Sequence, residues 1–334
     1  MVFRYEMFDF LRYFVLAMEK QQTIEIIRYH NSYKQQWDAF VNGAKNSTFL
    51  FRRDFMEYHK DRFDDFSLMI FVKDELKAIL PACKVNNEVM SHKWLTYGGL
   101  LVDEKCKFGL FQELFKEVLL YLKKQNIARL TIKSIPSIYG ETANDELLFL
   151  HQLYGSEMTM NLGSVVYNAA EIPVSKSIVR NAKNALKKGI EIRKTDDFDT
   201  FWNELLLPRL EERFQTKPVH TLSEIKYLKS LFPEEIELRA AFLNNEMIAG
   251  TVLFHNKKFV KSQYIASKSS YNKLGGLDLL HYELIKNLKT AYFDFGTSSG
   301  NEVVNESLLA WKEQFGARTL VFPTFSFNIN KKQI

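Results

Sequence analysis

Residues 236–266, IELRAAFLNNEMIAGTVLFHNKKFVKSQYIA, carry the clearest folding signal in the chain. Runs rich in β-branched and aromatic residues alternate there with Asn- and Lys-containing breaks that are typical of hairpin turns. We predict strands over Ile236–Leu243, Met247–His255 and Phe259–Ala266. A loop with Gly275 and Gly276 then leads into a predicted helix, Leu277–Leu288, and a strand, Ala291–Phe295. The second half therefore reads as a strand meander, a loop, a helix and a strand.

The first half repeats this order of elements with an unrelated sequence. Strands are expected over Ser67–Val72, Leu76–Val85 and Val89–Trp94, followed by a helix over Phe108–Lys124 and a strand over Ala128–Ser134. The two copies are offset by roughly 165 residues, a repeat of architecture and not of sequence. This pattern predicts a mixed α/β fold of the α+β class, built from two tandem domains.

Breaks in the pattern give the domain boundaries. Gly155, Gly163 and Pro173 punctuate a less periodic stretch in which we place the boundary between the domains. We expect an N-terminal extension over residues 1–22, a first domain over 23–163 and a second over 164–318. Residues 319–334 should form a terminal strand that returns to the first domain. In the extension, Phe8–Met18 is too short and too polar to span a bilayer. A helical extension or an overcalled start is preferred there to an amphipathic interfacial anchor.

Composition narrows the classes of protein. The chain has 334 residues, of which 46% are hydrophobic, and this excludes a disordered chain. The net charge of +5 is too small to indicate wholesale coating of nucleic acid, so an anion site must be local. Cys83 and Cys106 cannot make a disulfide framework, which favours a cytoplasmic protein, and no Cys/His spacing predicts a metal site.

Short motifs follow one another in both halves. Those of the second half are Arg180-Asn-Ala-Lys183 with Lys187-Lys-Gly-Ile190, Lys217-Pro218-Val-His220, Glu246-Met-Ile-Ala-Gly250, Gln263-Tyr264-Ile-Ala-Ser267, Asp294-Phe295-Gly296-Thr-Ser and Trp311-Lys312-Glu-Gln-Phe315-Gly316-Ala. Those of the first half are Thr48-Phe-Leu-Phe51, Tyr58-His59 and Tyr97-Gly98-Gly99. In this order the motifs resemble the FemAB family of acyl- and aminoacyltransferases. The resemblance implies two tandem domains of the GCN5-related N-acetyltransferase (GNAT) fold.

The resemblance also implies a reaction in which a primary amine attacks a carbonyl in a ternary complex, without a covalent enzyme intermediate. It places Lys312 in the substrate cavity, where a cation would neutralise a phosphate or the tetrahedral oxyanion. A solvated lysine beside Trp311 and Phe315 is the alternative. The resemblance further suggests that Tyr97 and Tyr264 bind the acceptor. Asp103 would orient or deprotonate the amine, unless it is a plain turn residue.

Two further side chains are candidates for acceptor binding. His220 precedes a capping box, Thr221-Leu-Ser-Glu224, so it either faces the cleft or merely enters the helix, and the latter is preferred. Asp294 lies at the end of a predicted strand. Its carboxylate would act as a base or, as we prefer, cap the turn that follows.

Two groups of residues are candidates for donor binding. Arg180, Lys183 and Lys187 recur on one helix face, which suits a diphosphate or RNA as well as an ordinary solvated face. Gly275 and Gly276 resemble the pyrophosphate loop of acetyltransferases, whose backbone N–H groups would bind coenzyme A.

Together these residues predict an acyltransferase with acyl-coenzyme A or aminoacyl-tRNA as co-substrate and no permanently bound cofactor. The expected acceptor is a primary amine on a nucleotide- or lipid-linked sugar or peptide precursor of cell-wall or surface-polysaccharide synthesis. Peripheral contact with the inner membrane face and contact with tRNA follow from such substrates. The alternative is a non-catalytic double domain that serves as a binding module or partner subunit.

Overall fold

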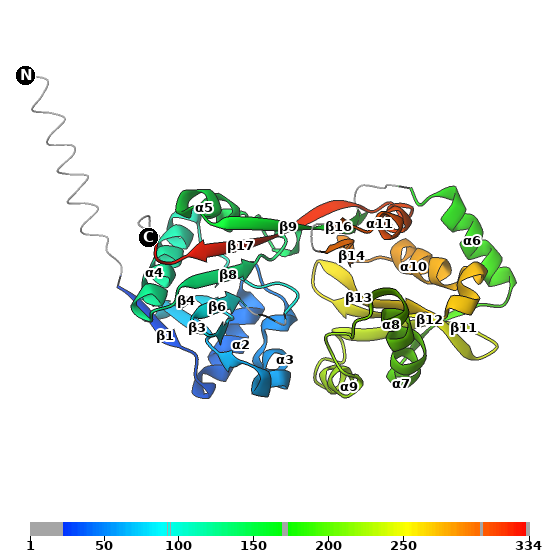
Figure 1. Cartoon of the computed structure of the whole chain (residues 1–334), viewed down its shortest axis with the longest axis horizontal. Coiled ribbons are helices and arrows are strands. Elements are labelled where there is room, and N and C mark those ends of the chain that lie inside the picture. The colour runs from blue at the N-terminus through cyan, green and yellow to red at the C-terminus, as the bar shows by residue number, and fades with distance from the viewer. Residues whose placement is uncertain (1–22, 92, 94, 169–172, 301–302, 332–334) are drawn as a thin grey trace, which may run out of the picture.

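The computed structural model describes residues 23–91, 93, 95–168, 173–300 and 303–331. Two halves of mixed α/β structure lie side by side along the long axis (Figure 1). One sheet runs through both halves in the order β10 (Glu191–Thr195), β11 (Ile236–Leu243), β12 (Glu246–His255), β13 (Phe259–Ser267), β14 (Tyr292–Thr297), β9 (Glu157–Tyr167), β17 (Arg318–Asn328), β8 (Arg129–Lys133), β6 (Glu88–Ser91), β5 (Cys83–Val85) and β2 (Asp64–Asp65). The prediction of an α+β class with two similar halves is confirmed.

The first half holds a second sheet, and a short hairpin follows β14. That sheet has the order β1 (Ile24–Arg28), β3 (Leu68–Val72), β4 (Glu75–Leu80) and β7 (Leu101–Val102), and the hairpin pairs β15 (Ser299–Gly300) with β16 (Val303–Val304). The sequence predicted one strand over Leu76–Val85, but the structure divides it into β4 and β5. Pro81 lies at the break, because proline has no backbone N–H to donate to a ladder.

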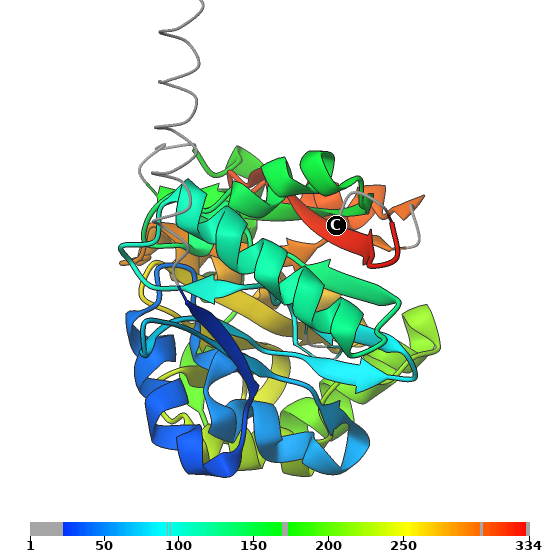
Figure 2. The ribbon, with the colours of Figure 1, turned by 90° about the vertical axis from the view of Figure 1, so that its left-hand side faces the viewer.

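Helices cover the sheets in both halves of the molecule (Figure 1). In the described residues they are α2 (Lys34–Gly43), α3 (Arg53–Met56), α4 (Phe108–Lys124), α5 (Glu146–Tyr154), α6 (Lys176–Lys187), α7 (Phe198–Thr200), α8 (Leu207–Phe214), α9 (Leu222–Leu231), α10 (Gly276–Lys286) and α11 (Glu306–Glu313). A π-helical segment, Phe201–Leu206, joins α7 to α8. Figure 2 shows α4 between the smaller sheet and β17, where its apolar face joins the core of the first half. No helix of the described part of the chain combines the length and the apolar character needed to cross a membrane. The extension, with its interfacial-anchor alternative, lies outside the described residues.

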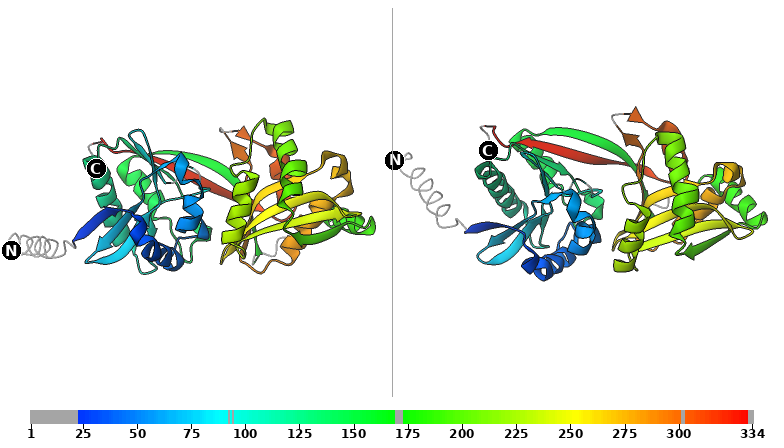
Figure 3. Two further views of the ribbon diagram at one scale, coloured as in Figure 1. Left: turned by 90° about the horizontal axis from the view of Figure 1, so that it is seen from below. Right: turned by 60° about the horizontal axis from the view of Figure 1, so that its bottom comes forward.

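A ribbon of two long strands joins the halves. β9 and β17 have 11 residues each and pair antiparallel from Arg318↔Val165 to Ser326↔Glu157. β17 then pairs with β8 of the first half, while β9 pairs with β14 of the second. Figures 1 and 3 show this ribbon spanning both halves. The chain therefore returns at its end to the first half through a strand, and both halves share one sheet.

Besides the β9–β17 ribbon, a cluster of aromatic side chains forms contacts between the two halves. Phe49 of the first half packs 5.4 Å, between ring centroids, from both Phe232 and Phe254 of the second half. Phe55 lies 6.1 Å from Phe254 in an edge-to-face arrangement. Large apolar rings buried at such a contact stabilise it through the area they remove from water. The halves thus meet through a core that contains residues of both.

Candidate functional site

The large sheet opens where the two halves meet. β13 and β14 run parallel and pair at three positions, from Phe259↔Tyr292 to Lys261↔Asp294. Beyond this last pair, β13 continues to Ser267 and β14 to Thr297, and the two strands form no further pairs with each other. The backbone groups along such an opening must find other hydrogen-bond partners. The residues at the last pair therefore stand at the start of a gap in the sheet.

A fully buried carboxylate lies at this position. Asp294 has no exposed surface. Its Oδ2 accepts hydrogen bonds from Lys261 Nζ at 2.9 Å and from the hydroxyl of Tyr139, and its Oδ1 accepts from the N–H of Gly296 at 2.6 Å. A buried charge of this kind needs a paired cation and further hydrogen bonds, and Asp294 has both. The sequence predicted that Asp294 caps the following turn, and its hydrogen bond with the N–H of Gly296 does this. The carboxylate also contacts both halves, because Tyr139 belongs to the first half and Lys261 to the second.

Lys312 is buried next to this carboxylate. It is 2% exposed, and its Nζ donates to the carbonyl oxygens of Gly296 at 3.0 Å and Thr297 at 2.9 Å. Burial lowers the pKa of Lys312 to about 7, an effect that Asp294 opposes and Lys261 reinforces. The alternative of a solvated lysine is therefore wrong. A lysine with a pKa near neutrality can gain or lose a proton during a reaction.

Two tyrosines of the first half complete the cluster. Tyr139 stacks on Phe259 with ring centroids 3.5 Å apart, and Tyr97 packs edge-on against Tyr139 at 5.3 Å. Burial raises the pKa of both hydroxyls, and the Asp294 carboxylate adds to the effect. Tyr97, Asp294 and Lys312, three candidates from the sequence, are thus gathered in one place. We refer to Tyr97, Tyr139, Lys261, Asp294 and Lys312 as the Asp294 cluster.

Tyr264 and His220 form a second pair. The Nδ1 of His220 lies 2.6 Å from the Tyr264 hydroxyl, which also accepts from the His220 backbone N–H at 3.2 Å. His220 immediately precedes α9, whose capping box formed by Thr221 and Glu224 is present as predicted. The side chain is nevertheless 3% exposed and lines a pocket, so it does more than enter a helix. Burial lowers the pKa of His220 to about 4.

This pocket has a volume of about 410 Å³ and lies between the halves. We call it the His220 pocket; it is lined by Leu50, Phe55, Lys93, Leu95, Thr96, Lys133, Val219, His220, Phe254 and Gln263. Lys133 is close enough to Lys261 of the Asp294 cluster for the two ammonium groups to repel each other. The pocket therefore borders the cluster.

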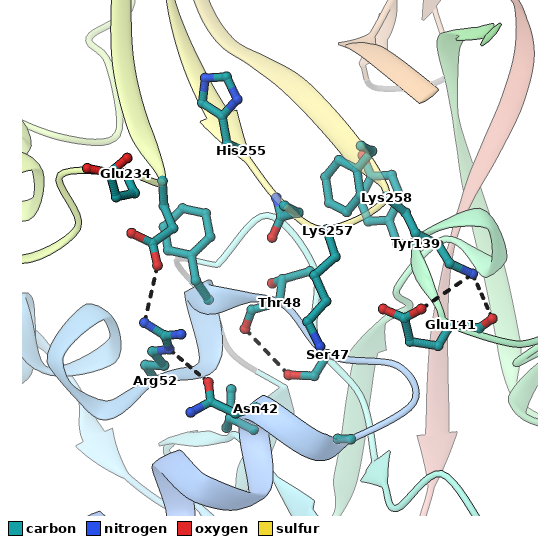
Figure 4. A pocket seen from close by; sticks show the side chains of 16 residues that line it. Asn42, Ser47, Thr48, Arg52, Tyr139, Glu141, Glu234, His255, Lys257 and Lys258 are labelled. Carbon is teal, nitrogen blue, oxygen red and sulfur yellow. Dashed lines mark hydrogen bonds and ion pairs between the residues drawn. The ribbon is translucent and has the colours of Figure 1, made fainter. Parts of the chain in front are cut away.

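A second pocket between the halves, of about 460 Å³, is shown in Figure 4. We call it the Arg52 pocket. Arg52 reaches across it to Glu235, 3.2 Å away, and Lys258 donates to the backbone carbonyls of Gly140 and Glu141. Its polar side chains thus connect the first half to the second, and Tyr139 of the Asp294 cluster forms part of its wall. The cluster therefore lies between two pockets.

Several predicted residues lie elsewhere. Asp103 follows β7 and pairs with Lys77 at 3.1 Å, in the smaller sheet of the first half. Arg180, Lys183 and Lys187 are exposed on α6, at the far end of the second half from the first (Figure 1). No contact of these residues with the Asp294 cluster is found in the described part of the chain. Their predicted roles stay predictions.

The predicted pyrophosphate loop lies at the start of α10. Gly275 has a φ of +80°, which suits glycine, and a side chain on Gly276 would come within 3.0 Å of Ile248. Both glycines thus have structural reasons to be there. Asp278, in the first turn of α10, accepts from Asn181 at 2.9 Å and from Trp311 at 2.9 Å. A carboxylate in this turn competes with a phosphate for the helix N-terminus.

Sequence reasoning missed Lys261, Tyr139 and Lys133. Lys261 lies in β13 directly after Phe259 and Val260, and a lysine at such a position is a usable signal, because a buried charge needs a partner. Tyr139 follows β8 in a short 3-10 turn, Ser137–Tyr139, and no pattern marks it. The described residues contain no group of three or more His, Cys, Asp or Glu that could hold a metal ion.

Comparison with known proteins identifies the fold. FemX has a similar structure, with a TM-score of 0.65 and 14% identity, over 92% of this chain and 98% of that one. L-PGS from Bacillus licheniformis gives a TM-score of 0.53 at 10% identity, over 91% and 94%. A tandem GNAT protein from the clavulanic acid biosynthesis pathway gives 0.50 at 11%, over 93% and 100%. No protein-family model and no curated protein sequence matches the chain. These structural similarities confirm the predicted tandem GNAT fold.

Proposed function

We propose that the chain is an acyltransferase that moves an acyl or aminoacyl group to a primary amine. The observation that carries this proposal is the opening of the sheet directly beside the Asp294 cluster. An extended donor chain with amide groups can lie along the unpaired edges of β13 and β14, as added strands do elsewhere. Its reactive carbonyl would then lie near Lys312.

The reaction needs one bond to form and one to break. The amine nitrogen attacks the donor carbonyl, the carbon–sulfur or carbon–oxygen bond to the donor breaks, and the amine proton passes to the leaving thiol or hydroxyl. Lys312, whose pKa is near 7, is suited to take up and return this proton or to donate to the oxyanion. Its two carbonyl partners, Gly296 and Thr297, hold Nζ in a fixed position. The Asp294–Lys261 pair fixes the strand that carries those carbonyls.

The acceptor in this proposal belongs to cell-envelope synthesis, as the resemblance to the FemAB family implies. A further structural neighbour, the C-terminal domain of a putative lysylphosphatidylglycerol synthetase, supports this choice, because its name includes a membrane lipid. A nucleotide- or lipid-linked sugar or peptide would present the amine. For the donor, Asp278 in the first turn of α10 disfavours a phosphate at Gly275 and Gly276. The exposed cations of α6 favour aminoacyl-tRNA.

A non-catalytic binding module is the second candidate. It is favoured by one observation: every charged group of the Asp294 cluster already has a partner within the chain. In that case the cluster would only hold the two halves together. Substitutions in the Asp294 cluster would then lower the stability of the fold and would not affect any transfer reaction directly.

A transfer assay with Lys312→Met distinguishes the two candidates. Purified protein is supplied with acetyl-coenzyme A or with aminoacyl-tRNA, together with amine acceptors of both classes, and the product is followed by mass spectrometry. We expect transfer by the unaltered protein and a loss of about 100-fold or more in the variant, the size usual for a lost acid–base group. Lys116→Met, at an exposed lysine of α4, is the matched control. Equal transfer by Lys312→Met would remove Lys312 from the reaction, and no transfer from any donor would support the binding module.

A further inference from the structure

The two pockets between the halves differ in charge. The Arg52 pocket includes three carboxylates, Glu141, Glu234 and Glu235, and its lining cations, Arg52, Lys257 and Lys258, balance them. The His220 pocket has two lysines, Lys93 and Lys133, and no carboxylate among its lining residues. Its positive charge is therefore not balanced from within the wall. A concave surface lined by one sign of charge attracts ligands of the other sign.

Lys133 is the less exposed of the two lysines of this pocket: it is half-buried, whereas Lys93 is exposed. It ends β8, where Leu130 and Ile132 are buried in the core and the alternate residues Arg129, Thr131 and Lys133 belong to the opposite face. Lys133 forms no ion pair with any residue that the structure describes. Burial lowers its pKa, and repulsion from Lys261 adds to this, while the charge of Lys261 is matched by Asp294. A bound anion would supply the partner that Lys133 lacks.

His220 contributes a neutral hydrogen-bond donor. The Tyr264 hydroxyl accepts from the backbone N–H of His220 and lies 2.6 Å from the Nδ1 of the ring. In the tautomer in which this hydroxyl donates to Nδ1, the ring proton resides on Nε2, because a neutral imidazole carries only one. Nε2 is buried and has no partner among the described residues. It therefore remains free to donate to a ligand.

The rest of the wall selects the body of the ligand. Leu50, Phe55, Leu95, Val219 and Phe254 form an apolar surface. The Oε1 of Gln263 is a buried acceptor without a partner in the described part of the chain, so a ligand with an N–H group would satisfy it. The pocket thus offers a cation, a neutral donor, an acceptor and an apolar wall.

We infer that the His220 pocket binds the oxyanion of the acceptor substrate, a phosphate or a carboxylate carried on a partly apolar body with a nearby N–H group. Lys133 matches its charge, and His220 Nε2 donates to it. This inference deepens the proposed function and rests on it for the identity of the ligand as the acceptor. The anion would be bound next to the Asp294 cluster, which is where the amine must be held for transfer.

Calorimetric titration tests the pocket without using catalysis. One probe is a uridine diphosphate N-acetylhexosamine, which offers phosphate, and the other is an N-acetylated dipeptide with a free carboxylate. We expect one of them to bind the unaltered protein and to bind Lys133→Met at least tenfold more weakly, as when a charge-assisted hydrogen bond is lost. Lys133→Arg and His220→Gln, which keep a donor, should retain more affinity than Lys133→Met and His220→Phe. Lys116→Met, on the surface of α4, should bind like the unaltered protein.

The outcomes distinguish failure of the inferred anion site from failure of the proposed acyltransferase function. If neither probe binds the folded protein, or if Lys133→Met binds as tightly as the unaltered protein, the inference is overturned. If a probe binds in a Lys133-dependent way but no transfer is ever detected, the pocket stands and the acyltransferase proposal fails. If transfer occurs with an unchanged KM in Lys133→Met, the acyltransferase stands and the acceptor is bound elsewhere. The probe that binds identifies the oxyanion as phosphate or carboxylate.

Discussion

Lys312 and Asp294 are linked through a single glycine. The Asp294 Oδ1 accepts the N–H of Gly296 at 2.6 Å, and the carbonyl of the same Gly296 accepts from Lys312 Nζ at 3.0 Å. Gly296 has a φ of +74°, and a side chain there would approach Lys261 Nζ to 3.2 Å. The positive φ favours glycine at this position, and a side chain there would also crowd the Lys261 ammonium. The backbone of Gly296 therefore fixes the positions of the two ionisable groups relative to each other through one hydrogen bond to each.

The buried Lys312 should make folding stability depend on pH. Its pKa falls from 10.5 to about 7 in the folded chain, so between these values the unfolded chain binds more protons. The free energy of unfolding should therefore rise with pH over this window, by up to about 1.4 kcal/mol per pH unit for one proton. Lys312→Met should lack this rise. Urea denaturation of both proteins at pH 7, 8 and 9 measures it, and parallel slopes would contradict the burial of the charge.

A second pH effect is expected on the acid side. Burial lowers the pKa of His281 from 6.5 to about 4, and its ring stacks on Phe295 at 5.3 Å. The unfolded chain takes up this proton first, so the stabilising difference is present above pH 6.5 and is lost as pH falls toward 4. His281→Leu should show a shallower loss of stability between pH 6.5 and 4. The exposed Asn184→Gln variant, which changes no titratable group, should keep the original slope over the same range.

Asp294→Asn should destabilise the fold strongly. The substitution leaves the Lys261 ammonium buried without its 2.9 Å partner, and breaking a buried pair in this way costs about 3–5 kcal/mol. The double variant Asp294→Asn/Lys261→Met should recover part of that loss, since no charge is left unmatched. Asp199→Asn, which breaks the exposed Lys226–Asp199 pair, serves as the control and should cost about 1 kcal/mol or less. A loss in Asp294→Asn as small as in this control would show that Lys261 is not desolvated.

The basic face of α6 tests the choice of donor. Changing Arg180, Lys183 and Lys187 to Gln should leave stability nearly unchanged, because all three side chains are exposed. If tRNA binds there, its affinity should fall and the salt dependence should weaken by roughly 0.7 in slope per lost phosphate contact. Fluorescence titration with tRNA at several salt concentrations measures both. The matched control changes Lys116, Lys123 and Lys124 of α4 to Gln, and an identical response of the two variants would return the α6 face to ordinary surface.

Much of the fold could be predicted because its signals are local. α4 matches its prediction over Phe108–Lys124, and β11 to β13 match within about two residues, the usual uncertainty of element ends. β9 was missed, since Gly155 and Gly163 read as punctuation. In the structure a side chain at Gly163 would collide with the ring of Phe322 on the neighbouring strand, at 2.1 Å. Glycine there permits close strand packing instead of marking a loop.

The amino-acid sequence by itself determined the two similar halves, the strand meanders and the residue types from which a site can be built. Only the tertiary structure decided which residues meet. Lys261 and Asp294 are 33 positions apart, and Tyr139 reaches Asp294 across 155. Their contact depends on the register of a parallel strand pair and on the way the halves dock. The same docking buries Lys312, whose pKa falls as a result, and Asp294, which therefore needs Lys261 as a partner. Periodicity along a chain reports neighbours on one face, whereas desolvation depends on everything that folds around a group.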